Sequence, residues 1–127
     1  MKRIGITGSR SRNSPDDFER LENKFFELYE NGDIIISGGA KAGADHFAQI
    51  IADRSNGKIS HVPFEATPEL YMKYGRKAPL IRNTRIAKES DILIAMPNPD
   101  SRTQGTMDTV TKFLEIHNND KTKLYLI

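Results

Sequence analysis

The fold of this chain is decided by Ile34-Ile35-Ile36-Ser37-Gly38-Gly39-Ala40-Lys41-Ala42-Gly43-Ala44-Asp45. Three β-branched residues in a row predict a strand that is buried on both faces, and the glycines after them predict a turn. Apolar residues then recur at helical spacing: Ala44, Phe47, Ala48, Ile51 and Ala52. Such a strand–turn–helix unit aims backbone N–H groups and the positive end of a helix at one point, where phosphate groups bind.

The composition indicates one globular domain over residues 1–127, with 37% hydrophobic and 28% charged residues. The absence of cysteine excludes disulfides, thiolate metal sites and cysteine nucleophiles. A net charge of +2 is too small to indicate nucleic-acid binding by itself. No signal peptide and no apolar run of about 20 residues is found, so we expect a cytoplasmic protein without membrane contact.

Strands and helices alternate along the chain. Apolar runs predict strands at residues 3–7, 34–36, 58–62, 91–96 and 124–127. Caps and apolar periodicity predict helices from 15 to about 30, from 44 until 56–57, from 79 to 88, and from 105 until 118–120. Residues 63–79 predict a loop with at most one helical turn, at 69–73. We therefore expect an α/β fold: a single Rossmann-like, doubly wound parallel sheet of about five strands in the order 3-2-1-4-5, with helices on both faces.

Three glycine-containing turns follow the first, second and fourth strands. They are Gly8-Ser9-Arg10, Ser37-Gly38-Gly39 and, after a polar loop at 97–104, Gly105-Thr106. In a sheet of this strand order the first and fourth strands are neighbours at the point where ligands bind. We therefore expect the three turns to lie on one rim of the sheet.

Each candidate residue on this rim has a functional and a purely structural interpretation. Gly38, Gly39 and Gly43 either bind phosphate through the backbone or only allow tight turns and close packing. The hydroxyls of Ser37 and Thr106 either bind a phosphate or satisfy a strand end and a helix cap, with Gly105 opening that helix. Asp45 either bonds a ribose hydroxyl or stabilises the helix dipole. Arg10 either reaches the rim or is solvated.

Taken in order, these motifs resemble the SLOG superfamily, which groups the Lonely guy (LOG) phosphoribohydrolases with the DNA-processing protein DprA and the YspA-like proteins. The matching segments are Gly8-Ser9, the glycine motif Gly38-Gly39-Ala40-Lys41-Ala42-Gly43-Ala44-Asp45, Arg82-Asn83 at a helix start, and Met96-Pro97 with Gly105-Thr106 after the fourth strand. The resemblance covers nearly the whole chain and implies a Rossmann-like nucleotide-binding domain.

The resemblance also implies roles for individual side chains. Arg82 would face the ligand and clamp a phosphate through paired N–H groups, with Asn83 as its companion. The catalytic glutamate of the LOG enzymes falls on Thr109, and Asp108, one residue earlier, is the acid nearest to that position. If the chain is an enzyme, Asp108 and Arg82 are the expected catalytic residues.

Three functions are expected, in decreasing order of preference. The first is binding of a nucleotide or a nucleotide-derived phosphate ligand by a sensor or sequestering protein. The second is phosphoribohydrolase-like hydrolysis of the N-glycosidic bond of nucleoside 5′-monophosphates. The third is single-stranded DNA binding in the manner of DprA. We also expect a homo-oligomer. We expect no cofactor and no metal, since the three histidines have no metal-ligand spacing.

Overall fold

The computed structural model describes residues 1–101 and 105–127. A single parallel sheet of five strands runs through it in the order β3-β2-β1-β4-β5. The strands are β1 (Arg3–Gly8), β2 (Ile34–Ser37), β3 (Ser60–Pro63), β4 (Ile92–Met96) and β5 (Leu124–Leu126). The predicted Rossmann-like sheet and its strand order are therefore confirmed.

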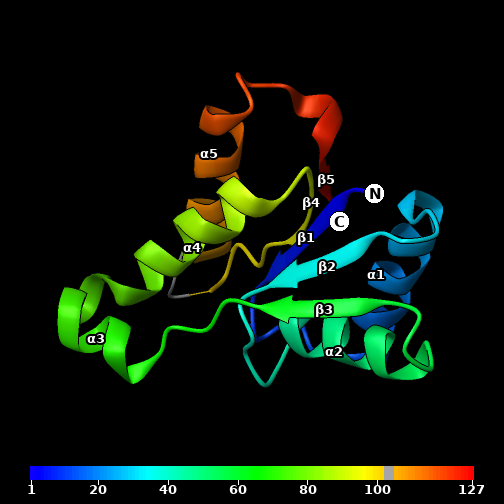
Figure 1. Cartoon of the computed structure of the whole chain (residues 1–127), viewed down its shortest axis with the longest axis horizontal. Coiled ribbons are helices and arrows are strands. Elements are labelled where there is room, and N and C mark those ends of the chain that lie inside the picture. Colours follow the sequence, from blue (N-terminus) through cyan, green and yellow to red (C-terminus); the bar gives the residue numbers. More distant parts are fainter. Residues whose placement is uncertain (102–104) are drawn as a thin grey trace.

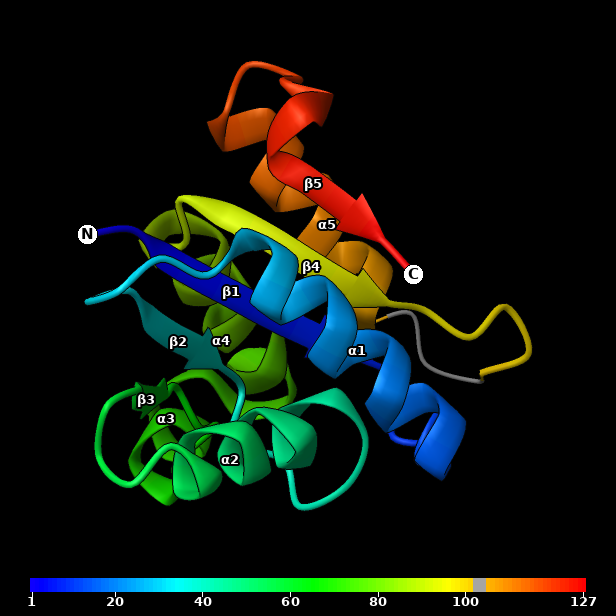
Figure 2. The same ribbon diagram turned by 90° about the vertical axis from the view of Figure 1, so that its right-hand side faces the viewer.

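Helices cover both faces of this sheet, as Figures 1 and 2 show. One face carries α1 (Pro15–Leu28) and α2 (Ala44–Arg54), and the other carries α4 (Ala78–Glu89) and α5 (Gly105–Ile116). Ser14 caps α1 as expected, and its hydroxyl accepts a hydrogen bond from the Asp17 amide while the Asp17 carboxylate caps the Ser14 amide. The predicted polar loop at 97–104 lies partly outside the described residues.

The core consists of two apolar clusters, one on each face of the sheet. The larger one joins the central strands to α1 and α2 and includes Ile6, Phe25, Ile35 and Phe47. The smaller one joins β4 to α4 and α5 around Leu93 and Phe113. The interior residues of β1 and β4 are buried on both faces of the sheet, and β4 accordingly is a continuous apolar run. In the described ranges no helix has both the length and the apolar character needed to cross a membrane.

Residues 63–79 were expected to form a loop with at most one helical turn, at 69–73; the turn is present, but the helical part is longer than expected. This segment forms α3 (Pro68–Tyr74) and a 3-10 turn, η1 (Gly75–Lys77), that leads into α4. Thr67 caps α3 through its hydroxyl, with Pro68 directly after it. Proline is favoured at the first helical position, because its missing N–H would have no partner there. Pro68 and Pro79 therefore mark the starts of α3 and α4, whereas Pro63 ends β3. A second short 3-10 turn, η2 (Lys121–Lys123), precedes β5.

Candidate functional site

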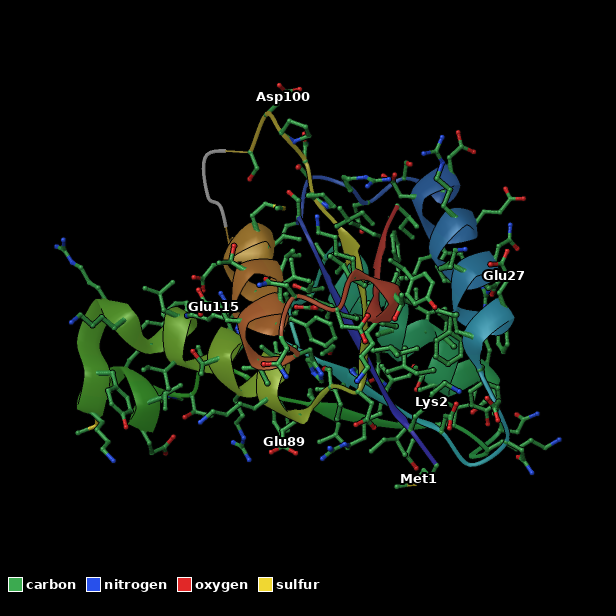
Figure 3. All side chains as sticks on the ribbon, turned by 90° about the horizontal axis from the view of Figure 1, so that it is seen from above. Met1, Lys2, Glu27, Glu89, Asp100 and Glu115 are labelled. Atoms are coloured by element: carbon green, nitrogen blue, oxygen red, sulfur yellow. The ribbon has the colours of Figure 1, made fainter. Side chains whose placement is uncertain are left out.

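A cavity of about 890 Å³ lies at the carboxyl end of the sheet. In Figure 3 this end is marked by Asp100, and Met1 and Lys2 lie at the opposite end of β1. The cavity is enclosed by the residues after β1, the turn after β2, the start of α4 and the start of α5. It has the position at which ligands bind in open α/β sheets and the size of a small-molecule site.

Most of the residues predicted from the sequence line this cavity. They are Gly8, Ser9, Arg10, Gly38, Asp45, Arg82, Asn83, Gly105, Thr106 and Asp108. Three predicted residues do not. Ser37 is fully buried, Gly43 packs beneath the chain at Ser9, and Gly39 lines a second cavity on the other side of the turn.

The amides of the glycine turn after β2 already have partners within the protein. The Gly39 N–H donates to Ser37 Oγ at 3.2 Å, and the Ala40 N–H donates to Asp45 Oδ2 at 3.0 Å. Asp45 also accepts from the Gly38 amide. The Gly43 N–H donates to Asn13 Oδ1 at 2.8 Å. Side chains of the protein thus accept the hydrogen bonds of the Gly38, Gly39 and Gly43 amides, which were expected to bind phosphate.

Asp45 and Arg82 meet across Gly38. A Cβ at position 38 would lie 2.8 Å from Arg82 Nη1 and 2.9 Å from Asp45 Oδ2, so a side chain there would displace the ends of both. Arg82 donates to the Gly38 carbonyl at 3.1 Å and to Asn83 Oδ1 at 2.9 Å. Burial raises the pKa of Asp45, although the Ala40 and Gly38 amides and the charges of Arg82 and Arg10 oppose this shift.

Asp108 and Thr109 are the two residues at and next to the position of the family's catalytic glutamate, and they differ in exposure to the cavity. Asp108 lines the cavity, whereas Thr109 is fully buried and its hydroxyl donates to the Gly105 carbonyl within α5. Asn83 and Lys112 both hold Asp108 Oδ2, at 3.1 Å and 2.9 Å. The acid that a ligand can contact on this helix is therefore Asp108.

Two arginines on the cavity wall, Arg10 and Arg76, are not held in ion pairs by the described residues. In residues 1–101 and 105–127, neither Arg10 nor Arg76 forms an ion pair or a side-chain hydrogen bond. Three residues of the site were not predicted from the sequence: Arg76, Lys112 and Asn13. Arg76 was not predicted because residues 63–79 were interpreted as a loop. Lys112 lies one helical turn after Asp108, a spacing that favours an ion pair. The contact of Asn13 with Gly43 joins distant parts of the chain and leaves no local signal.

Comparisons with protein-family models, with curated proteins and with solved structures gave no match to this chain.

Proposed function

We propose that the chain binds a phosphorylated small molecule of nucleotide type in the cavity at the carboxyl end of the sheet. The observation that carries this proposal is the cluster of Arg10, Arg76 and Arg82 on the cavity wall. Guanidinium groups match the geometry of phosphate oxygens, and the two that lack a protein partner can bind an anion without breaking an ion pair.

The parts of such a ligand match different parts of the wall. We assign the phosphate to the start of α5, at Gly105 and Thr106, where the helix dipole adds to the arginine charges. The glycine turn after β2 is less suited to an anion, because Asp45 already accepts hydrogen bonds from its amides. Asp45 instead suits ribose hydroxyls, as a hydrogen-bond acceptor. Pro79, Leu80 and Ile86 form an apolar part of the wall that suits a base.

Isothermal titration calorimetry with AMP, GMP, CMP, UMP and ADP-ribose tests this proposal, with adenosine as the ligand that lacks phosphate. We expect binding of at least one phosphorylated compound, no binding of adenosine, and weaker binding at higher salt. Arg76→Ala should weaken binding about tenfold. Arg20→Ala, on an exposed part of α1, is the control and should bind like the wild type. Heat only with a single-stranded oligodeoxynucleotide would instead favour the DprA-like function.

A second candidate function is hydrolysis of the N-glycosidic bond of a nucleoside 5′-monophosphate. The observation in its favour is that Asp108 lines the same cavity and is oriented by Asn83 and Lys112. Water would add across the bond, leaving a hydroxyl on ribose C1 and a proton on the base. A carboxylate is the group that takes the proton of such a water or stabilises the positive charge on the sugar.

Release of free base, followed by liquid chromatography, tests this second function. Asp108→Asn should abolish release while AMP still binds. Glu115→Gln, an exposed acid further along α5, should leave the rate unchanged. Equal rates in the wild type and in Asp108→Asn would remove Asp108 from the mechanism.

We also propose that the chain self-associates through α3. All residues from Tyr71 to Lys77 are exposed, no residue of α3 is buried, and Met72 is 88% exposed. Figure 1 shows α3 standing away from the sheet beyond the end of α4.

A helix this short is unstable in water without a packing partner. Its amino-terminal side is acidic, at Glu65 and Glu69, and its carboxyl-terminal side is basic, at Lys73 and Lys77. Two antiparallel copies would therefore pair opposite charges.

Sedimentation velocity tests this interface. Met72→Glu should dissociate the oligomer, whereas Phe26→Glu, at an exposed apolar position on α1 across the sheet, should not. A monomeric wild type at the highest concentration measured, or an oligomer that is sensitive only to Phe26→Glu, would contradict an interface at α3.

A further inference from the structure

A chain of hydrogen bonds runs behind the glycine turn, on the side away from the principal cavity. It starts at Asp53, whose Oδ1 accepts from Gln49 Nε2 at 2.7 Å. Gln49 Oε1 lies 2.8 Å from His61 Nδ1, and His61 Nε2 lies 2.5 Å from Ser37 Oγ. Ser37 Oγ in turn accepts the Gly39 N–H. The chain therefore connects a surface carboxylate of α2, through β3, to the turn after β2.

The donor and the acceptor in each of these hydrogen bonds follow from the carboxylate of Asp53 at the end of the series. An ionised carboxylate only accepts, so the amide nitrogen of Gln49 must face Asp53 and its oxygen must face His61. His61 Nδ1 then carries the proton. In the neutral ring Nε2 is an acceptor, and the Ser37 hydroxyl donates to it. The Ser37 oxygen remains available to accept from Gly39.

Protonation of His61 is incompatible with this arrangement at Ser37. Nε2 would become a donor, and the Ser37 oxygen would face two N–H groups while its own hydrogen lost its acceptor. Ser37 is 0% exposed, so water cannot accept that hydrogen unless the turn moves. Burial lowers the pKa of His61, with the charge of Asp53 opposing the shift, which agrees with a neutral ring at pH 7.

These hydrogen bonds hold the turn after β2, and the same turn contacts the polar side chains of the principal cavity. The Gly38 carbonyl accepts from Arg82, and the Gly38 and Ala40 amides donate to Asp45. Asp45 and Ala40 line both cavities, so they form the partition between them. A displacement of the turn at Ser37 and Gly39 would therefore displace Arg82 and Asp45.

We propose that His61 is a positioning residue, which in its neutral form holds the turn after β2 in shape and releases it when protonated. Resting on the proposed function, the inference extends to regulation of that site: phosphate-ligand binding weakens as the pH falls through the titration of His61. The titration of His61 must be distinguished from that of the other ionisable groups around its ring. They are Asp53, Asp45 and His46 on α2, Lys41 in the turn, and Glu65 after β3.

Two NMR titrations between pH 8 and pH 5 test the positioning role without any ligand. In the wild type, the Gly39 amide signal should move with the same midpoint as the His61 ring signal. In His61→Gln, whose side-chain oxygen can accept from Ser37 without titrating, the Gly39 signal should stay constant. His46→Gln is the matched control, because His46 lines the same cavity but makes no hydrogen bond to Ser37. It should behave like the wild type.

Calorimetry with AMP at pH 7.5 and pH 5.5 tests the consequence for binding. Because the phosphate of AMP itself titrates near pH 6, the comparison is made between variants at the same pH. The wild type and His46→Gln should lose at least fivefold more affinity than His61→Gln. A urea midpoint at pH 8 confirms that each variant is folded.

Three outcomes decide the inference. The inference is overturned if the Gly39 amide signal does not titrate with the midpoint of the His61 ring. It is also overturned if that signal loses its pH dependence in His46→Gln. Equal loss of AMP affinity in all variants overturns its extension to binding. Absence of binding by AMP and by the other phosphorylated compounds at both pH values overturns the proposed function instead, and the Gly39 titration still decides whether His61 positions the turn.

Discussion

Two glycine-containing helix starts lie at the cavity, and they differ in the partners of their backbone amides and in the space around their glycines. The turn before α2 is closed from within: Ser37, Asp45 and Asn13 accept its amides, and side chains or backbone crowd the positions where its glycines lack a Cβ. At the start of α5, the nearest atom of the described residues to a Cβ added at Gly105 is Asn83 Nδ2, at 4.0 Å. A glycine motif before a helix thus predicts a tight turn. Whether it binds a ligand depends on side chains elsewhere in the chain.

The largest expected effect belongs to Gly43, in the closed turn. Its backbone, with φ 72° and ψ −150°, lies in a region open essentially to glycine alone, and an added Cβ would lie 2.5 Å from the Ser9 carbonyl oxygen. Gly43→Ala should lower the free energy of unfolding by about 3 kcal/mol, measured by urea denaturation. Gly32→Ala is a control for positive φ alone, since nothing lies within 4 Å of that position. Equal losses in both variants would mean that crowding contributes nothing.

Asp45 should have the next largest effect, and the size should depend on the replacement. Asp45→Ala removes the acceptor of the Gly38 and Ala40 amides and should cost about 2 kcal/mol of unfolding free energy. Asp45→Asn keeps an acceptor and removes a charge that burial disfavours, so its cost should be smaller. If Asn is as damaging as Ala, the charge itself holds the turn closed.

The raised pKa of Asp45 also predicts a pH dependence. The folded protein holds the Asp45 proton more tightly than the unfolded chain does. Its contribution to stability is therefore fully present below the unfolded pKa, near 3.8, and is lost as the pH rises through the folded value. Asp45→Asn lacks this contribution. The stability difference between wild type and Asp45→Asn should thus shrink as the pH rises from 3.5 to 7, in urea titrations at each pH.

The difference between the two turns also shows how far sequence reasoning reached. The buried strand Ile34–Ile36 and the cap at Ser14 are local patterns, and from such patterns the sheet and its strand order were predicted. The roles of Asn13 and His61 were not, because their partners Gly43 and Ser37 lie 30 and 24 positions away. No periodicity or spacing reports a contact of that kind. Asp108 was predicted only because it is the acid nearest to the position of the catalytic glutamate in the motif that the chain resembles.

Asn13 should have a smaller effect than Asp45, because it closes the turn with one neutral hydrogen bond. Asn13→Ala leaves the Gly43 N–H, which is in a buried residue, without its acceptor. The expected loss of unfolding free energy is about 1 kcal/mol. Asn23→Ala, at an exposed position in the middle of α1, is the control and should change stability by less than about 0.5 kcal/mol. A loss as large as that of Asp45→Ala would make Asn13 an equal contributor to the closed turn.

Gly105 should show the smallest effect on stability and the clearest effect on binding. Its surroundings leave room for a methyl group, so Gly105→Ala should change the unfolding free energy by less than about 0.5 kcal/mol. The same methyl group sits at the wall of the cavity where we assign the phosphate, and it should weaken AMP binding several-fold in calorimetry. Gly43→Ala reverses this pattern, with a large loss of stability. If Gly105→Ala leaves AMP affinity unchanged, the phosphate is not at the start of α5. Arg10 and Arg82, which line the same cavity, would then be the groups to replace.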